Sequence, residues 1–215
     1  MTRVLVQNFA ISLDGFAAGP RQREDAPLGD GGLGLHEWIF ATRAWRASHG
    51  GEGGEEGLDN DYALAGSKQI GATIMGRNMF GPVRGPWGDE PWRGWWGEDP
   101  PFGGDVFVLT HHPRPSLAMP NGTTFHFVGG SPAEVLERAR ESAGGRDVKL
   151  AGGASTIQQF MRAGLVDELH IAIAPILLED GERLFDGPVG SLGAYECTAL
   201  QSSSAVVHVR LTRTH

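Results

Sequence analysis

The sequence predicts an α/β protein with a three-layer architecture, in which a mainly parallel sheet ends in a C-terminal antiparallel hairpin. Three observations support this fold class. Short apolar runs rich in β-branched residues, such as residues 4–11, are typical of buried strands in parallel sheets. Segments with apolar residues at helical spacing alternate with these runs. Two strand-like stretches around residues 201–204 close the chain, and this order of elements favours helices packed on a sheet.

Composition narrows the classes of protein. With 215 residues, 40% of them hydrophobic, the chain can bury a core, and we predict a single domain over residues 1–215. The net charge of -8 argues against binding to nucleic acid or to a membrane surface. The single cysteine, Cys197, allows neither a disulfide framework nor a thiolate zinc site, so we expect no metal and a cytoplasmic location. The first residues lack a long apolar run, and we expect neither secretion nor a membrane anchor.

The first part of the chain predicts two strands joined by helices. Residues 4–11 form the first strand. Apolar residues recur at helical spacing over residues 35–47, which predicts a helix there. Asp59 or Asn60 is a suitable cap for a second helix that continues to about residue 70. This helix leads into a strand over residues 72–75.

Residues 81–104 are predicted to form a binding loop or a lid, because a long structureless loop inside a compact domain is uncommon. The loop contains four tryptophans, at Trp87, Trp92, Trp95 and Trp96. These indoles either pack on the domain or on a partner subunit, or they stack against a planar substrate. The sequence leaves both alternatives open.

The second half of the chain predicts the rest of the sheet. Four further strands are indicated by their apolar and β-branched content, at residues 105–110, 124–128, 148–151 and 165–178. Pro113 is expected to stop the sheet after the first of these strands. Ser131 is expected to cap a helix, because proline follows it at the first helical position and glutamate at the third. Residues 195–211 predict the closing hairpin.

Three of the predicted strands end in groups that suit an anionic ligand. Gly152 and Gly153 lie between a strand and a helix, where backbone N–H groups can approach a phosphate, although two glycines also commonly make a plain turn. Gly76 and Arg77 follow a second strand, and two histidines and Arg114 follow a third. The carboxyl ends of parallel strands share one edge of a sheet. Together, the three strand ends predict a phosphate or nucleotide site.

In these segments the chain resembles the dihydrofolate reductase-like superfamily, specifically the reductase domain of bifunctional riboflavin-biosynthesis deaminase-reductases and its stand-alone relatives. The matching pieces span nearly the whole chain, namely residues 12–19, 75–77, 108–114, 152–153 with the following helix, and 175–185. Their order and spacing carry the match. The His-x-Glu and Pro-Cys-x-x-Cys pattern of the zinc deaminase half is absent, which puts a riboflavin-pathway substrate in doubt.

The resemblance implies an NADPH-dependent oxidoreductase, similar to dihydrofolate reductase or to 5-amino-6-(5-phosphoribosylamino)uracil reductase, that acts as a homodimer on a small planar heterocycle of the pteridine or pyrimidine kind. It implies that the nicotinamide lies beside Ala10, Ala17 and Ala18. It implies that the pyrophosphate is held by Gly76, Arg77, Asn78, Gly152, Gly153, Ala154, Ser155 and Thr156. The adenosine ribose and its 2′-phosphate would contact Thr110, His111, His112 and Arg114, together with Arg77. A phosphate needs fixed cations close to it, which favours Arg77 and Arg114 as the residues that select NADPH over NADH.

Roles on the substrate side are less determined by the sequence. Asp14 and Glu37 are candidate proton donors by their location, although Asp14 can equally cap the turn before Gly15. Asn8, Trp38 and Trp87 are candidates for substrate contacts. Two functions of other classes remain open. The first is a nucleotide-binding or regulatory protein of the same fold without turnover, and the second is a structural dimer module in which the two glycines only make a turn.

Overall fold

The computed structural model describes residues 2–81, 85–88, 92–186 and 193–214. Their contacts divide the chain into two compact units. Unit 1 comprises residues 1–5 and 69–166, and unit 2 comprises residues 6–68 and 167–215. Strand β1 (Val4–Ser12) begins in unit 1 and continues through unit 2. Whether the two units act as a single domain stays a prediction.

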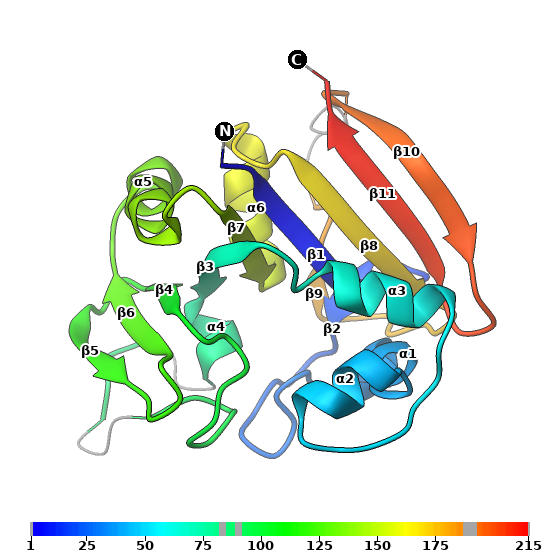
Figure 1. Cartoon of the computed structure of the whole chain (residues 1–215), viewed down its shortest axis with the longest axis horizontal. Coiled ribbons are helices and arrows are strands. Elements are labelled where there is room, and N and C mark those ends of the chain that lie inside the picture. Colours follow the sequence, from blue (N-terminus) through cyan, green and yellow to red (C-terminus); the bar gives the residue numbers. More distant parts are fainter. Residues whose placement is uncertain (1, 82–84, 89–91, 187–192, 215) are drawn as a thin grey trace. The chain divides into compact units, whose positions relative to one another are not determined.

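Unit 1 is built on a mostly parallel sheet (Figure 1). Its strands follow the order β1-β7-β3-β4-β6-β5. The start of β1, together with β7, β3, β4 and β6, forms parallel pairs, and β5 runs antiparallel to β6 at the edge. The bounds are β3 (Ile70–Gly76), β4 (Asp105–Leu109), β5 (Arg114–Ala118), β6 (Thr124–Val128) and β7 (Asp147–Gly152). The central strands are almost fully buried, as their continuous apolar runs predict.

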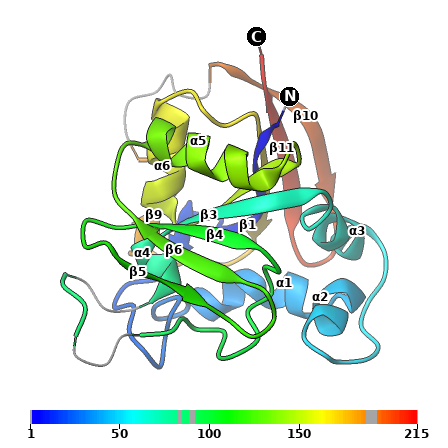
Figure 2. The ribbon, with the colours of Figure 1, turned by 60° about the vertical axis from the view of Figure 1, so that its left-hand side comes forward.

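Helices α4 (Arg77–Phe80), α5 (Pro132–Ala143) and α6 (Ala154–Arg162) complete unit 1. Figure 2 shows α5 beside the sheet, where it packs on β3, β4 and β7. The predicted cap of α5 is confirmed. The Ser131 hydroxyl accepts the backbone N–H of Glu134 at 3.3 Å, and the Glu134 carboxylate accepts the backbone N–H of Ser131 at 2.7 Å.

The sequence-based expectation that Pro113 stops the sheet is wrong. Strand β5 starts directly after it, and Arg114 pairs with Phe127 of β6. A register shift between Arg114 and Leu117 coincides with Pro115. Because β5 is an edge strand with one side free of ladder hydrogen bonds, prolines are tolerated in it. The sheet therefore continues where the sequence indicates a break.

Unit 2 contains the C-terminal hairpin that the sequence predicts (Figure 1). Its strands follow the order β10-β11-β8-β1, with β10 antiparallel to β11 and β11 antiparallel to β8. The bounds are β8 (Glu168–Ala174), β10 (Tyr195–Ser202) and β11 (Val207–Arg213). A separate small pair, not indicated by the sequence, joins β2 (Phe16–Ala18) to β9 (Glu182–Arg183). The mixed α/β fold class is confirmed.

The predicted helix over residues 35–47 is three shorter helices in the structure: η1 (Gly32–His36), α1 (Glu37–Phe40) and α2 (Arg43–Ser48). The break occurs at Thr42, whose extended backbone and hydroxyl cap α2 by accepting the N–H of Trp45 at 3.2 Å. Helix α3 (Leu58–Ala65) begins just before the expected cap, with Gly57 as its N-cap residue.

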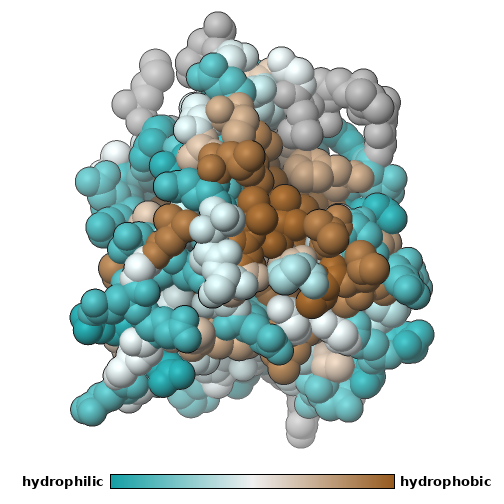
Figure 3. All heavy atoms as spheres, turned by 90° about the vertical axis from the view of Figure 1, so that its right-hand side faces the viewer, coloured by the Kyte–Doolittle hydropathy of each residue, from teal (hydrophilic) through white to brown (hydrophobic). Residues whose placement is uncertain are grey.

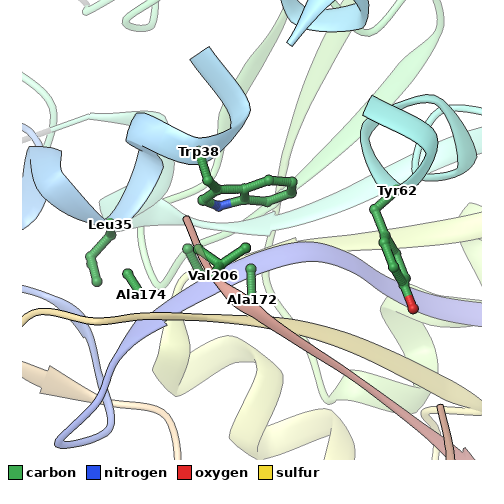
Figure 4. Close-up of a cluster of buried hydrophobic side chains, with 7 residues drawn as sticks. Leu35, Trp38, Tyr62, Ala172, Ala174 and Val206 are labelled. Atoms are coloured by element: carbon green, nitrogen blue, oxygen red, sulfur yellow. The ribbon is translucent and has the colours of Figure 1, made fainter. Parts of the chain in front are cut away.

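Helices η1, α1 and α3 pack on β1, β8 and the turn before β11 through a cluster of buried side chains (Figure 4). The cluster consists of Ala10, Leu35, Trp38, Tyr62, Ala172, Ala174 and Val206. Among the described residues, no helix combines the length and apolar character needed to cross a membrane.

Candidate functional site

Three strand ends meet in unit 1, as the sequence predicts for a parallel sheet. Met75 of β3 pairs with Gly152 of β7, and Gly76 pairs with Leu109 of β4. A Cβ on Gly76 would lie 2.2 Å from the Thr156 hydroxyl oxygen, so only glycine leaves room for this contact. The turn after β3 therefore lies against the start of α6.

The turn between β7 and α6 is open toward a ligand. Gly152 has a φ of 132°, a conformation that glycine adopts readily, and the peptide bond between Gly152 and Gly153 is cis. Among the described residues, a Cβ on Gly153 would meet nothing within 4 Å, and no side chain caps the start of α6. Ala154 and Thr156 are buried and Ser155 is exposed, so the first turn presents backbone N–H groups of the kind that bind phosphate.

Two arginines and one tryptophan form a stack beside these strand ends. The guanidinium carbon of Arg77 lies 3.2 Å from the centre of the Trp87 ring, and that of Arg114 lies 3.8 Å from it. Two guanidinium groups cannot both occupy one face of a ring at these distances, so the indole lies between them. Arg114 also lies over Phe127, at 4.0 Å from the ring centre. We call Arg77, Trp87 and Arg114 the arginine–tryptophan stack.

The cations of the stack are poorly solvated and incompletely paired. Nε and Nη2 of Arg77 and Nη1 of Arg114 are buried and have no hydrogen-bond partner among the described residues. Burial lowers the pKa of Arg77. Burial, together with the nearby charge of Arg77, lowers the pKa of Arg114 to about 10. Two nearby, half-buried cations are costly unless an anion joins them.

Thr110 and the residues after it connect this stack to β4. The Thr110 hydroxyl accepts hydrogen bonds from Nη1 of Arg77 at 3.3 Å and from the backbone N–H of His112 at 3.0 Å. The Trp87 indole N–H donates to the His112 carbonyl at 2.6 Å. His111 is exposed. The structure thus brings the predicted residues of the three strand ends together in unit 1, with Asn78 half-buried on α4.

The predicted lid falls partly outside the described residues, which omit 82–84 and 89–91. Its described tryptophans pack on unit 1. Trp87, Trp92 and Trp96 lie against the apolar cluster around Phe80 and Phe125, and the Trp92 indole donates to the Phe80 carbonyl at 2.9 Å. These contacts correspond to the alternative in which the indoles pack on the domain.

The remaining candidates lie in unit 2. Ala10 is buried in the same cluster as Trp38, and Ala18 is buried in β2, where it pairs with Glu182. Asn8 lies in β1 with a φ of 56°. Trp38 is 3% exposed, and its indole nitrogen has no hydrogen-bond partner among the described residues. The alanines that the resemblance places beside a nicotinamide are thus held by well-packed elements, and Ala17 between them is half-buried.

The Asp14 carboxylate accepts hydrogen bonds that stabilise a turn. Its carboxylate accepts the Ser12 hydroxyl at 2.5 Å and the backbone N–H groups of Leu178 at 3.2 Å and Glu179 at 2.8 Å. These bonds, the one from Ser12 above all, lower the pKa of Asp14. A carboxylate held in its ionised form by three donors suits capping better than proton donation. Glu37, the second candidate, is exposed at the start of α1.

Some notable groups were not found from the sequence. His170 and His208 are fully buried and hydrogen-bonded to each other at 2.9 Å. His36 is held neutral, because burial lowers its pKa to about 4, and its Nδ1 is buried without a hydrogen-bond partner among the described residues. Histidines on separate elements meet only once strand register is known, and the sequence carries no local signal for this.

Several solved structures share the fold of this chain. A putative riboflavin biosynthesis protein from Shewanella sp. PV-4 has a TM-score of 0.61 at 20% identity, with both chains fully covered. RibD from Acinetobacter baumannii has a TM-score of 0.57 at 17% identity, and this chain spans 58% of its length. Dihydrofolate reductase from Enterococcus faecalis, solved with NADP(H), has a TM-score of 0.50 at 15% identity, covering all of this chain and 97% of that one. At these identities the likeness shows the fold.

Sequence comparison identifies the family. Uncharacterized protein YyaP of Bacillus subtilis (strain 168) is 37% identical over 59 residues, which cover 27% of this chain and 31% of that protein. The model of the RibD C-terminal domain matches residues 3–209, nearly the whole chain. The protein therefore belongs to the RibD C-terminal domain family, whose reductase-type fold it shares.

Proposed function

We propose that the protein is an NADPH-dependent reductase that transfers a hydride to a small planar heterocycle. The observation that carries this proposal is the arginine–tryptophan stack, in which buried guanidinium nitrogens beside three converging strand ends have no hydrogen-bond partner among the described residues. A dianionic phosphate satisfies such donors. Each charge-assisted hydrogen bond contributes about 1.5–3 kcal/mol, or about tenfold to a hundredfold in affinity.

The residues present fit the phosphate groups of the cofactor. In our proposal, Arg77, Arg114, Thr110 and the following histidines hold the ribose 2′-phosphate. The open turn at Gly153 and the first turn of α6 hold the pyrophosphate, with Gly76 and Asn78 beside it. The cofactor supplies the hydride, and the protein orients it and excludes water. Ala10, Ala17 and Ala18 are assigned to the nicotinamide by the resemblance.

Unit 2 offers support for a heterocyclic substrate. The Trp38 indole nitrogen and His36 Nδ1 are both buried without a hydrogen-bond partner among the described residues, and each is a separate candidate contact because side chains two residues apart on a helix do not face each other. His36 is held neutral by its lowered pKa of about 4. A neutral imidazole and an indole suit the uncharged hydrogen-bonding edge of a pteridine or pyrimidine. Asn8 remains a further candidate contact, whereas Trp87 is now assigned to the phosphate side.

The decisive experiment is a titration of purified protein with NADPH and with NADH, followed by tryptophan fluorescence. We expect NADPH to bind at least about tenfold more tightly, because only it carries the 2′-phosphate. Arg77→Ala and Arg114→Ala should each weaken NADPH binding by at least about tenfold and leave NADH binding much less affected. Arg140→Ala is the matched control, since Arg140 pairs with Glu137 on the surface of α5. Equal affinity for both nucleotides would rule out the proposed phosphate site.

The alternative of a binding protein without turnover needs a second readout. Oxidation of bound NADPH, followed by its nicotinamide absorbance during a screen of pteridines and pyrimidines, would show a reductase. Tight NADPH binding with no oxidation by any member of the screen would favour the alternative. Absence of binding to either nucleotide would leave only the structural module.

We also propose a cytoplasmic homodimer. Leu200 pairs with Val209, and Val209 with Ile171, so an apolar row crosses β10, β11 and β8 on one face. The row is exposed only toward β10 and the start of β11: Leu200 is 69% exposed and Val207 36%, whereas Ile171 is 2% exposed. Figure 3 shows a hydrophobic area on this side of the molecule. An exposed apolar sheet face is typical of an interface, and a second copy of the chain is its simplest occupant.

Sedimentation tests the dimer directly. The wild type should sediment as a dimer of 23.0 kDa chains, and Leu200→Glu should yield monomers because it places a charge in the apolar row. Leu64→Glu is the control, since Leu64 is 42% exposed on α3. A wild type that sediments only as a monomer would contradict the dimer.

A further inference from the structure

A chain of hydrogen bonds crosses the interior of unit 2. His170 Nδ1 lies 3.1 Å from the backbone nitrogen of Asn8, and His170 Nε2 lies 2.9 Å from His208 Nδ1. His208 Nε2 lies 2.7 Å from the Asp59 carboxylate. Both imidazoles are fully buried, and the Asp59 side chain is 15% exposed. We call His170, His208 and Asp59 the histidine relay.

The fixed donor at one end sets the direction of the relay. The backbone N–H of Asn8 donates to His170 Nδ1, so this nitrogen accepts and the proton of His170 resides on Nε2. His170 then donates to His208 Nδ1, and His208 donates from Nε2 to Asp59. The side-chain amide of Asn8 also lies 3.1 Å from His170 Nδ1. Because the Asn8 amide nitrogen donates to the Ala63 carbonyl, the amide oxygen faces the ring, and it cannot accept from His170 Nδ1 in this direction of the relay. The fixed backbone N–H decides the assignment, and we therefore assign both imidazoles the neutral Nε2–H tautomer.

Aromatic side chains hold the two imidazoles in place. Tyr62 stacks on both, with ring centres 4.2 Å from His170 and 4.1 Å from His208. Trp38 meets them edge-on, at 6.3 Å and 5.2 Å. Tyr62 and Trp38 also belong to the buried cluster that contains Ala10 (Figure 4). The relay thus packs against the same side chains as the residue assigned to the nicotinamide.

Asn8, at the end of the relay, has an uncommon backbone conformation. Its φ of 56° is in the left-handed region, a backbone conformation that residues other than glycine rarely adopt. Its amide nitrogen donates to the Ala63 carbonyl at 3.3 Å, and a Cβ on Gly66 would lie 2.2 Å from that nitrogen. Asn8 is therefore held from two sides, by the relay through its backbone and by α3 through its side chain.

We propose that the histidine relay positions Asn8, and through it the backbone of β1 at Ala10, for binding of the cofactor. His170, His208 and Asp59 are positioning residues in this scheme, because they act through Asn8. The relay needs an acceptor at Asp59 rather than a negative charge. A second charged pair near the relay, Arg210 with Glu168 at 3.6 Å, lies beside Tyr62. The substitutions described below do not alter either residue of this pair. This inference rests on the proposed function.

The test compares two changes at one position. Asp59→Ala removes the acceptor, leaves the buried Nε2–H of His208 without its partner, and should weaken NADPH binding by about tenfold. Asp59→Asn keeps an acceptor oxygen without the charge, and should bind NADPH within about twofold of the wild type. His208→Phe should resemble Asp59→Ala. His126→Phe is its control, because His126 also bonds an aspartate, Asp105, but lies in unit 1.

Nitrogen-15 spectra of the imidazoles provide a readout that does not depend on the cofactor. We expect His170 and His208 of the wild type to show neutral Nε2–H tautomers, and His170 to lose this single tautomer in Asp59→Ala but keep it in Asp59→Asn. A charged imidazole, or a proton on His170 Nδ1, would overturn the relay. Unchanged NADPH binding in Asp59→Ala, or an equal loss in Asp59→Asn, would overturn the positioning role.

The two possible failures are distinguishable. If the wild type binds no NADPH, the proposed function fails and the positioning role fails with it, whatever the spectra show. If the wild type binds NADPH and the variants at Asp59 bind it equally well, only the positioning role fails.

Discussion

The guanidinium carbon of Arg77 lies 3.2 Å from the centre of the Trp87 ring. This contact joins the end of β3 to the tryptophan-rich loop, which the sequence separates by ten residues. On the other face of the indole lies Arg114, at the start of β5. Trp87 therefore keeps the two cations apart beside the strand ends. Its role as proposed here is structural support of the phosphate site.

The stack predicts that Trp87→Leu destabilises the protein. The change removes two cation–π contacts from a poorly solvated site and part of an apolar cluster, so we expect the free energy of unfolding to fall by about 2–3 kcal/mol. Urea denaturation measures it. Trp95→Leu is the matched control, because Trp95 contacts Trp92 rather than an arginine, and its effect should be smaller. Equal losses in the two variants would contradict a stabilising role of the stack.

Asp14→Asn separates capping from proton donation. Because hydrogen bonds to Ser12, Leu178 and Glu179 lower the pKa of Asp14, its ionised form stabilises the folded state above the ordinary value of 3.8. The variant should be less stable at neutral pH. The difference should shrink as the pH falls through the lowered pKa of Asp14. Binding and oxidation of NADPH should persist in the variant, and their loss without a change in stability would restore Asp14 as a catalytic candidate.

His36 predicts a loss of stability in mild acid. In the unfolded chain, His36 takes up a proton near its ordinary pKa of 6.5. In the folded state, burial lowers the pKa of His36 to about 4. The free energy of unfolding should therefore fall between these two pH values, by about 1–3 kcal/mol because the ring is only partly shielded. His36→Gln should lack this part of the pH dependence. Urea titrations at several pH values measure it, with His49→Gln as the exposed control, and identical profiles for the wild type and His36→Gln would contradict the prediction.

The parts of the fold that could be predicted have local causes. Buried parallel strands such as β3 are continuous apolar runs, and the cap at Ser131 depends on residues within three positions of it. Strand β5 could not be predicted, because Pro113 before it and Pro115 within it indicate a break and its pairing is supplied by β6. The helix break at Thr42 could not be predicted because two local signals compete there. The apolar pattern favours one continuous helix, whereas the Thr42 hydroxyl caps a new one.

The candidate site, like the fold, has parts that could be predicted from the sequence and parts that could not. The strand ends at Gly76, Arg77 and Gly152 could be predicted, because topology brings carboxyl ends of parallel strands to one edge. The contact between Trp87 and two arginines depends on how a long loop folds back, and the pairing of His170 with His208 depends on strand register. Neither has a sequence pattern of its own. Both are decided by tertiary packing.

The contact between Gly76 and Thr156 offers a test of how tightly the turn after β3 is packed on α6. A methyl group added at position 76 would lie 2.2 Å from the Thr156 hydroxyl oxygen but 3.5 Å from the Thr156 Cβ. Gly76→Ala should therefore destabilise the wild type by about 1–3 kcal/mol, as overpacking does. In a Thr156→Ala background the hydroxyl is gone, and the same change should cost little. In a Thr156→Ser background the hydroxyl remains, and the full loss should return. Urea denaturation of these single and double variants gives the coupling energy directly. Additive effects would mean that the turn relaxes away from α6, and with it the close approach on which the proposed pyrophosphate site depends.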